Sequence, residues 1–436
     1  MSGIPKGYKK TEVGVIPEDW DVKRLGDLTT STTGGTPSTN VLEYWGGSIP
    51  WMSSGDLHLK QIYNVNGRIT QIGLENSSAH IIPKNCVLIG LAGQGKTRGT
   101  AAINRIPLCT NQSIGAILPK NTFSSDYLFY VIDSMYEHLR SLSSGDGGRG
   151  GLNLNILNHI VVSLPNFTEQ KAIAEVLSDM DALIEAQKEL IAKKRAIKQG
   201  TMQDLLSGRV RLPGYETKGW KHTDIGDIPD DWDVKKLGEE GVFLTTSSYT
   251  RSELREYGDV ACLHYGDIHT RFHTWLDCSS TELPMISRDM VKQYPYLKNG
   301  DLVIADASED YEGLGDCVEI CNIDSRLCIG GLHTIVYRAK PGLFAPSYIG
   351  LFRNLQVVRN QLVSQAVGTK VYSLTNSMIG SILVPIPSLL SEQQAIAHVL
   401  SDMDDELETL EAELEKLNHM KRGMMQELLT GRIRLI

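Results

Sequence analysis

Residues 169–212 read EQKAIAEVLSDMDALIEAQKELIAKKRAIKQGTMQDLLSGRVRL, and residues 392–435 read EQQAIAHVLSDMDDELETLEAELEKLNHMKRGMMQELLTGRIRL. The two copies align without a gap, and 23 of the 44 positions are identical. In the second copy the apolar residues alternate between spacings of four and three, which is the heptad pattern of a coiled-coil helix. These seam residues are Ile396, Leu400, Met403, Leu407, Leu410, Leu414 and Leu417.

The first copy carries the same seam in register, with polar interruptions at Gln187, Lys194 and Lys198. Its apolar seam residues are Ile173, Leu177, Met180, Ile184 and Ile191. Each copy predicts a helix of about 38 residues, roughly 57 Å long. In the second helix we expect a capping box between Ser391 and Gln394 and a C-terminus at Gly431.

A lone helix of this length with one apolar stripe needs a partner. The other copy is the simplest partner, because two tandem copies within one chain can pair antiparallel about a pseudo-two-fold axis. A coiled coil in a scaffold protein would show the same periodicity, so that alternative stays open.

A shorter repeat precedes each half of the chain. GYKKTEVGVIPEDWDVKRLG (7–26) and GWKHTDIGDIPDDWDVKKLG (219–238) are identical at 13 of 20 positions. The regions that follow, roughly 27–163 and 239–385, share little sequence. The repeated segments indicate one structural role that is performed twice. The divergent inserts between them indicate two different recognition roles.

The divergent inserts read as β-rich domains. Short apolar runs such as CVLIGL, SIGAIL, DLVIAD and HTIVYR are separated by Gly, Asn, Pro and Asp, and one helix is expected late in each insert. We therefore predict an α+β fold with two β-rich mixed domains, each followed by a long helix, and the two helices pairing as an antiparallel coiled coil. The predicted domains are 1–165 and 213–386, and the helical segments are 166–212 and 387–436.

Charge argues against a simple nucleic-acid binder, because the formal net charge is −9. Residues 1–165 carry 14 basic and 12 acidic side chains, whereas residues 213–386 carry 16 basic and 23 acidic ones. If the second domain binds DNA, it must cluster its basic groups on one face or rely on a partner for the attraction to phosphate.

The seven cysteines are irregularly spaced, and neither a signal peptide nor an apolar run of about 18 residues is apparent. This pattern favours reduced thiols in the cytoplasm. Cys317, Cys321 and Cys328 could in principle hold zinc, but no fourth ligand is placed to complete the site, so we expect small residues in a sheet.

The stretch GLAGQGKT, Gly90 to Thr97, matches the phosphate-binding pattern G-x-x-x-x-G-K-[ST]. A working phosphate loop needs a helix directly after it, and here RGTAAINRIP follows, which reads as a strand. The equivalent run of the second domain, DLVIADASEDYEGLG, replaces the lysine loop with acidic residues. We therefore interpret GLAGQGKT as a recognition loop and keep an NTPase as the weaker alternative.

Loops on a rigid sheet commonly carry recognition residues, and Arg, Lys, Asn and Gln can pair with base edges in the major groove. The candidate DNA-binding residues of the first domain are Gln94, Lys96, Thr97, Arg98 and Arg149. Those of the second domain are Arg251, Arg255, Arg271 and Lys370.

The chain resembles the specificity subunit of type I restriction–modification enzymes. The resemblance is carried by IPEDWDVKRLGDL (16–28), YWGGSIPWMSSGDL (44–57), LPNFTEQKAIAEVLSDMDALI (164–184) and the later copies IPDDWDVKKLG (228–238) and IPSLLSEQQAIAHVLSDMD (386–404). It covers essentially the whole chain.

The resemblance implies two target-recognition domains that each read one half of an asymmetric, bipartite sequence in double-stranded DNA. It also implies two methyltransferase (modification) subunits and restriction–translocation subunits as partners, with S-adenosylmethionine, ATP and Mg bound by those partners. We expect no cofactor, metal or catalytic residue in this chain. No Asn-Pro-Pro-Tyr or Asp-Pro-Pro-Tyr loop for amino methylation occurs in the sequence.

Overall fold

The computed structural model describes residues 4–93, 95–142, 151–216, 219–272, 274–368 and 370–435. Its contacts divide the chain into two compact units. Unit 1 comprises Met1–Glu189 and Ala412–Ile436, and unit 2 comprises Leu190–Glu411. Each long helix therefore starts in one unit and ends in the other.

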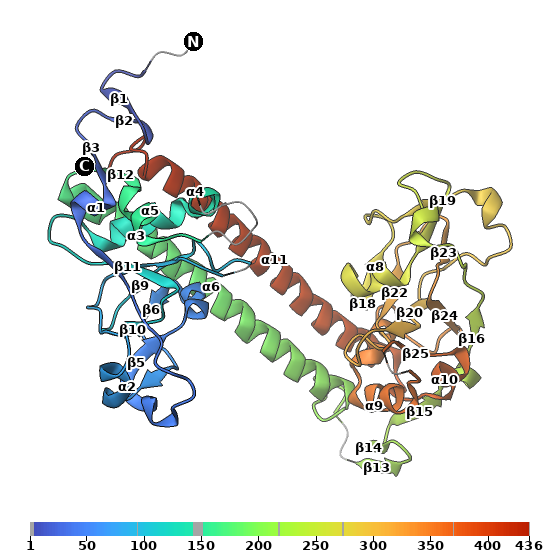
Figure 1. The fold of residues 1–436 in the computed structure, drawn as a ribbon. Helices are drawn as coiled ribbons and strands as arrows, with labels where there is room; N and C mark the ends of the chain where they lie inside the picture. The colour runs from blue at the N-terminus through green and yellow to red at the C-terminus, as the bar shows by residue number, and fades with distance from the viewer. Residues whose placement is uncertain are drawn as a thin grey trace. The chain divides into compact units, whose positions relative to one another are not determined.

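Unit 1 contains a β-rich domain, the start of the first long helix and the end of the second (Figure 1). Its elements are β1 (Tyr8–Thr11), β2 (Gly14–Pro17), β3 (Asp21–Arg24), α1 (Leu25–Leu28), β4 (Ser31–Thr33), η1 (Leu42–Tyr44), β5 (Trp45–Met52), η2 (Ser54–Leu59), β6 (Gln61–Ile62), β7 (Arg68–Ile69), α2 (Gln71–Glu75), β8 (Val87–Gly90), β9 (Ala101–Asn104), β10 (Cys109–Thr110), β11 (Ile114–Ile117), α3 (Ser125–Ser134), α4 (Tyr136–Leu142), α5 (Leu154–His159), β12 (Val161–Leu164) and the long helix α6 (Phe167–Leu206).

Unit 2 repeats this order with different sequences. Its elements are β13 (Trp220–Thr223), β14 (Gly226–Pro229), β15 (Trp232–Lys236), α7 (Leu237–Glu240), β16 (Gly241–Leu244), η3 (Arg251–Glu253), β17 (Val260–Leu263), α8 (Tyr265–Thr270), β18 (Thr274–Asp277), β19 (Met285–Ile286), η4 (Arg288–Met290), β20 (Leu302–Ala305), β21 (Ala307–Ser308), β22 (Cys317–Cys321), β23 (Cys328–Gly330), β24 (Thr334–Ala339), η5 (Ile349–Asn354), α9 (Gln356–Gln365), β25 (Tyr372–Ser373), α10 (Asn376–Ser381), β26 (Leu383–Pro387) and the long helix α11 (Leu390–Leu428).

The two β-rich domains share one topology. The five-stranded sheet has the order β4-β11-β8-β9-β6 in unit 1 and β16-β24-β20-β22-β18 in unit 2. The three-stranded sheet is β10-β5-β7 in unit 1 and β23-β17-β19 in unit 2. The parallel pairs also correspond, because β6–β9 and β5–β10 match β18–β22 and β17–β23. The divergent inserts are therefore two versions of one fold.

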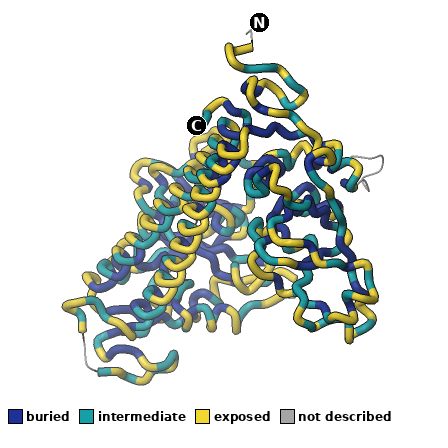
Figure 2. The backbone as a smooth tube through the Cα atoms, turned by 90° about the vertical axis from the view of Figure 1, so that its left-hand side faces the viewer, coloured by how far each residue is buried: buried dark blue, intermediate teal, exposed yellow. Residues whose placement is uncertain are grey.

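Both faces of the five-stranded sheets are buried, since their central strands are continuous apolar runs. Successive residues of a strand point to opposite faces. In β8, Val87 and Ile89 pack into one core cluster and Leu88 into another. In β20, Leu302 and Ile304 pack into one core cluster, and Val303 and Ala305 pack into another. In Figure 2 exposed and intermediate residues recur along the long helices.

Two long helices form where the sequence predicts them. Helix α6 has 40 residues and α11 has 39. Ile173, Leu177, Ile184, Ile191, Ile396 and Leu400 are buried, and the remaining predicted seam residues are half-buried. Helix α11 ends at Leu428, and Gly431 adopts a φ of 69°, as a C-terminal glycine should. The capping box predicted at Ser391 is wrong, because α11 already begins at Leu390.

Within each unit the two helices run antiparallel. In unit 1, Lys421 pairs with Asp181 at 2.6 Å, and Gln187 donates to Glu413 at 3.2 Å. In unit 2, Lys194 pairs with Glu406, and Lys198 with Asp404. The polar seam positions of α6 thus face acidic residues of α11, which explains why the first copy of the heptad tolerates them.

The helix-starting Glu-Gln pair is buried in both copies. Gln170 accepts a hydrogen bond from the Ser124 N–H and donates to Pro165 O, both at 2.8 Å. Gln393 accepts from the Ala345 N–H and donates to Pro387 O, both at 2.9 Å. Each glutamine therefore attaches its helix to the β-rich domain that precedes it.

Each glutamate of the pair binds an arginine from beyond the other long helix. In unit 2, Arg211 donates to both oxygens of Asp231, at 2.9 and 2.8 Å, and to Glu392, at 2.6 and 2.8 Å. In unit 1, Arg434 makes the same contacts with Asp19 and Glu169. We call these two groups the arginine knots. The two carboxylates raise the pKa of Arg211 and Arg434 above the usual range.

The cysteine cluster is structural. Cys317 and Cys321 lie four residues apart on strand β22, so their Cα atoms are roughly 13 Å apart and cannot share a zinc ion. Among the described residues, no group of His, Cys, Asp or Glu is arranged to hold a metal ion. Within the same ranges, no helix combines the length and apolar character that a membrane span requires.

We predict that replacing Arg211 with Ala lowers the free energy of unfolding by about 3 kcal/mol, because the Glu392 carboxylate, 1% exposed, is left without its counter-charge. Urea unfolding followed by tryptophan fluorescence measures the change. Arg209→Ala is the matched control, since Arg209 forms an exposed pair with Asp204 that contributes at most about 1 kcal/mol. Equal effects of the two variants would contradict the role of the knot.

We also predict that the native thiols react slowly at pH 8. Burial raises the pKa of Cys86, Cys317 and Cys321 to about 12, so the reactive thiolate is scarce. Titration with a chromogenic disulfide reagent should detect all seven cysteines at once in denaturant and only slowly in buffer. Stoichiometric bound zinc in the purified protein would instead contradict a purely structural role.

Candidate nucleic-acid interface

The loop with the phosphate-binding pattern is a hairpin between β8 and β9. The Gly99 N–H donates to Gly90 O at 2.9 Å, and the Gly90 N–H donates to Thr100 O at 3.0 Å. Strand β9 starts at Ala101, so a strand follows the loop where a phosphate-binding loop requires a helix. Gly95 and Gly99 adopt φ values of 77° and 81°, which the tight turn requires.

Helix α4 anchors this hairpin through main-chain carbonyls. The Arg140 guanidinium donates to Gly95 O at 2.5 Å, and the Tyr136 hydroxyl donates to Lys96 O at 3.3 Å. The Lys96 side chain is exposed, whereas Thr97 and Arg98 are half-buried. The other two candidates of this domain, Gln94 and Arg149, lie outside the described residues.

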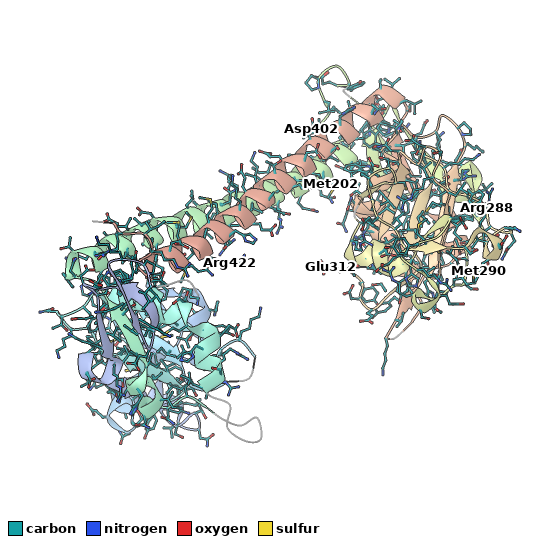
Figure 3. All side chains as sticks on the ribbon, turned by 90° about the horizontal axis from the view of Figure 1, so that it is seen from above. Met202, Arg288, Met290, Glu312, Asp402 and Arg422 are labelled. Carbon is teal, nitrogen blue, oxygen red and sulfur yellow. The ribbon has the colours of Figure 1, made fainter. Side chains whose placement is uncertain are left out.

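The equivalent segment of unit 2 connects β20 to β22 and is anchored in the same way. Arg359 donates to the carbonyls of Tyr311 and Glu312, both at 3.3 Å, and Arg353 also donates to Glu312 O. The Tyr311 ring stacks on Tyr372, with 4.0 Å between ring centroids. Strand β25, which holds Tyr372, pairs with β21, and exposed Lys370 lies just before it. Figure 3 shows Glu312 and Arg288 on opposite sides of the domain.

Unit 2 also contains a pocket of about 920 Å³ lined by four arginines. Three of the predicted candidates, Arg251, Arg255 and Arg271, meet there. Lys370 is not among the lining residues. Arg326 was not among the predicted candidates. It lines the pocket because strand β23, which follows it, pairs with β17. No local signal marks Arg326, since 55 residues separate it from Arg271.

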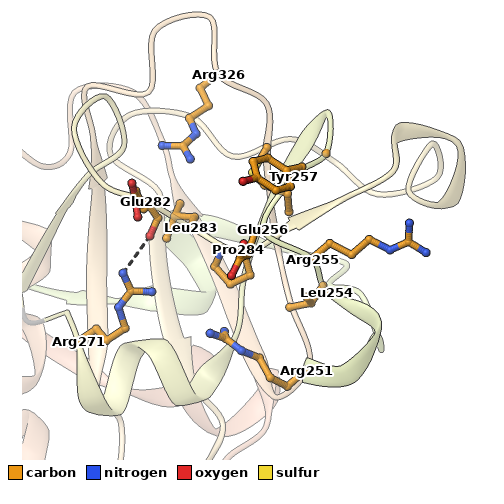
Figure 4. Close-up of a pocket in the computed structure, with 12 residues that line it drawn as sticks. Arg251, Leu254, Arg255, Glu256, Tyr257, Arg271, Glu282, Leu283, Pro284 and Arg326 are labelled. Atoms are coloured by element: carbon orange, nitrogen blue, oxygen red, sulfur yellow. Dashed lines mark hydrogen bonds between the residues drawn. The ribbon is translucent and has the colours of Figure 1, made fainter.

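Internal acceptors hold three of the four guanidinium groups, and Figure 4 shows the bond from Arg271 to Glu282. Arg251 donates to both oxygens of Asp267, at 3.0 and 2.8 Å. Arg271 donates to Glu282 O at 3.0 Å, and Arg326 donates to Cys278 O and Thr281 O, both at 2.6 Å. In Figure 4 the Arg255 side chain extends away from the other three. We call this group the arginine pocket.

We predict that Mg-ATP does not change the thermal unfolding temperature of the chain, because a strand follows GLAGQGKT. Differential scanning fluorimetry over micromolar to millimolar Mg-ATP tests this, with Lys96→Ala in parallel. A saturable stabilisation that Lys96→Ala abolishes would restore the NTPase interpretation.

Comparisons with known proteins agree with this architecture. A family model described as type I restriction modification DNA specificity domain matches residues 17–193 and 229–419. The chain is 27% identical to the type I restriction enzyme MjaVIII specificity subunit of Methanocaldococcus jannaschii, over 96% of this chain and 94% of the relative. It is 34% identical to the MjaIX specificity subunit of the same organism, where the match spans 53% of this chain and 54% of the relative.

Solved structures show the same fold at low sequence identity. A chain from a study of complex assembly and conformational transition of the type I R-M system aligns with a TM-score of 0.57 and 15% identity, covering 96% of this chain and 99% of that one. The type I restriction–modification S subunit from M. genitalium aligns with a TM-score of 0.54 and 15% identity, over 94% and 96% of the two chains. The matches of the family model cover both recognition domains and most of both long helices. This chain therefore belongs to the type I restriction–modification DNA specificity family.

Proposed function

We propose that the chain reads an asymmetric, bipartite sequence in double-stranded DNA, with one half-site for each β-rich domain. The observation that carries this proposal is that one topology presents two unlike sets of loops. The β8–β9 hairpin carries Lys96 and Arg98, whereas the β20–β22 connection carries Glu309, Asp310 and Glu312. Because base edges differ in their donors and acceptors, unlike loops on equal frames should select unlike half-sites.

The antiparallel contacts of α6 and α11 support a role for the helices in spacing the half-sites and docking partners. We propose two methyltransferase subunits and restriction–translocation subunits as those partners, and double-stranded DNA in the cytoplasm as the ligand. Methylation and cleavage would then occur in the partners, with this chain non-catalytic. S-adenosylmethionine, ATP and Mg would likewise be bound by the partners.

Recognition in this scheme needs no covalent chemistry from the chain. Phosphate contacts would fix the orientation of each domain on the duplex, and loop side chains would read base edges. Two domains that act together on one face of the duplex favour half-sites about one helical turn apart.

Mapping adenine methylation across a genome tests the proposal directly. We expect co-expression with the cognate methyltransferase subunit to give a methylated motif with two unlike blocks separated by unspecified bases. A symmetric motif, a single block or no motif would contradict the proposal, and the absence of any motif with an intact complex would favour the scaffold alternative.

Exchanging one insert tests the assignment of one half-site to each domain. Replacing residues 27–163 with the corresponding insert of a relative should change one block of the motif and leave the other block and the spacing unchanged. The reciprocal exchange of residues 239–385 is the matched control and should change the other block. Changes in both blocks after either exchange would contradict the assignment.

A further inference from the structure

We infer that the arginine pocket is the DNA contact of the second recognition domain and that Arg255 is the residue that reads a base there, through the acceptor edge of a guanine. The inference rests on the proposed function and adds to it a position in the fold and a base chemistry. Guanine presents two acceptors, N7 and O6, in the major groove, which match the parallel donors of one guanidinium group.

The net charge of the second domain opposes DNA binding unless basic side chains gather locally. Residues 213–386 carry 23 acidic and 16 basic side chains, so this domain as a whole repels DNA. The lining of the arginine pocket reverses that balance locally, with four arginines against Glu256 and Glu282. A domain with this composition needs such a cluster to approach a phosphate backbone.

Three of the four pocket arginines are bound inside the domain, and one has donors to spare. The guanidinium groups of Arg251, Arg271 and Arg326 already have acceptors inside the domain. The Arg255 guanidinium is exposed, and it has no hydrogen bond or ion pair to any residue that the structure describes. Its backbone is nevertheless fixed, because Arg255 and Met285 exchange N–H···O bonds of 2.9 and 2.8 Å. Arg255 thus combines a rigid attachment with unused donors.

The equivalent position of unit 1 carries no side chain. The 3-10 helices η1 (Leu42–Tyr44) and η3 (Arg251–Glu253) precede β5 and β17, which are corresponding strands of the two three-stranded sheets. Counting forward from these two helices places Gly46 opposite Arg255. The shared fold therefore does not require an arginine at this position, which leaves it available for recognition in the second domain.

The test compares methylation motifs of the full complex, co-expressed with its methyltransferase, for three single variants. Arg255→Ala removes the guanidinium, and Arg255→Lys keeps the charge but loses the parallel donors. Lys340→Ala is the control, because it removes an exposed positive charge of the same domain outside the arginine pocket.

We expect Arg255→Ala and Arg255→Lys to relax discrimination roughly tenfold to 100-fold at one guanine of one block. That block should be the one changed by exchanging residues 239–385. Lys340→Ala should leave the motif unchanged. Thermal unfolding should be little affected by Arg255→Ala, since the guanidinium has no hydrogen bond or ion pair to another residue that the structure describes.

Other outcomes would overturn the inference. An unchanged motif with uniformly weaker methylation, restored by Arg255→Lys, would assign Arg255 to a phosphate. An unchanged motif at full strength would exclude Arg255 from the interface. If the unmodified complex gave no bipartite motif, the proposed function would fail first, and the variants would not be needed to show it.

Discussion

The fold depends on two guanidinium groups, each shared by two carboxylates. In each arginine knot, the segment that follows one long helix reaches the first turn of the other long helix and the turn before β3 or β15. Glu169 and Glu392 are almost completely buried, so each needs a permanent counter-charge at its position. Arg211 follows the C-terminal end of α6, and Arg434 follows the C-terminal end of α11. Each knot can therefore form only when the end of one long helix lies against the start of the other. The glutamine beside each glutamate then attaches the same helix to its own domain.

The sequence was sufficient to predict the helices and their seam, because heptad periodicity is a local property that a repeat makes visible twice. It also indicated two β-rich inserts, from apolar runs and turn residues. The shared topology of those inserts could not be recognised, since strand order depends on pairings between distant segments. The arginine knots were hidden for the same reason. Arg211 lies 20 residues from Asp231 but 181 from Glu392.

Only part of the candidate site could be predicted from the sequence. Arg251, Arg255 and Arg271 were selected from the sequence only as basic residues near loops, and the structure brings these three together. Sequence could not indicate that Asp267 holds Arg251, or that Arg255 alone among the four pocket arginines extends away from the others. The match of GLAGQGKT to a phosphate loop shows the limit of a short motif. The letters fit, but strand β9 begins where a helix would be required.

The β8–β9 hairpin and the β20–β22 connection are both anchored through main-chain carbonyls. Arg140 and Tyr136 hold one tip, and Arg353 and Arg359 hold the other. Every residue type supplies the same carbonyl, so most tip positions, apart from Gly95 with its positive φ and Tyr311 with its stacked ring, have little influence on whether the tip stays in place. Mutations at those positions can therefore accumulate with little loss of folding stability, and under the proposed function a lineage would acquire new target sequences by drift at these loops while the scaffold stays unchanged.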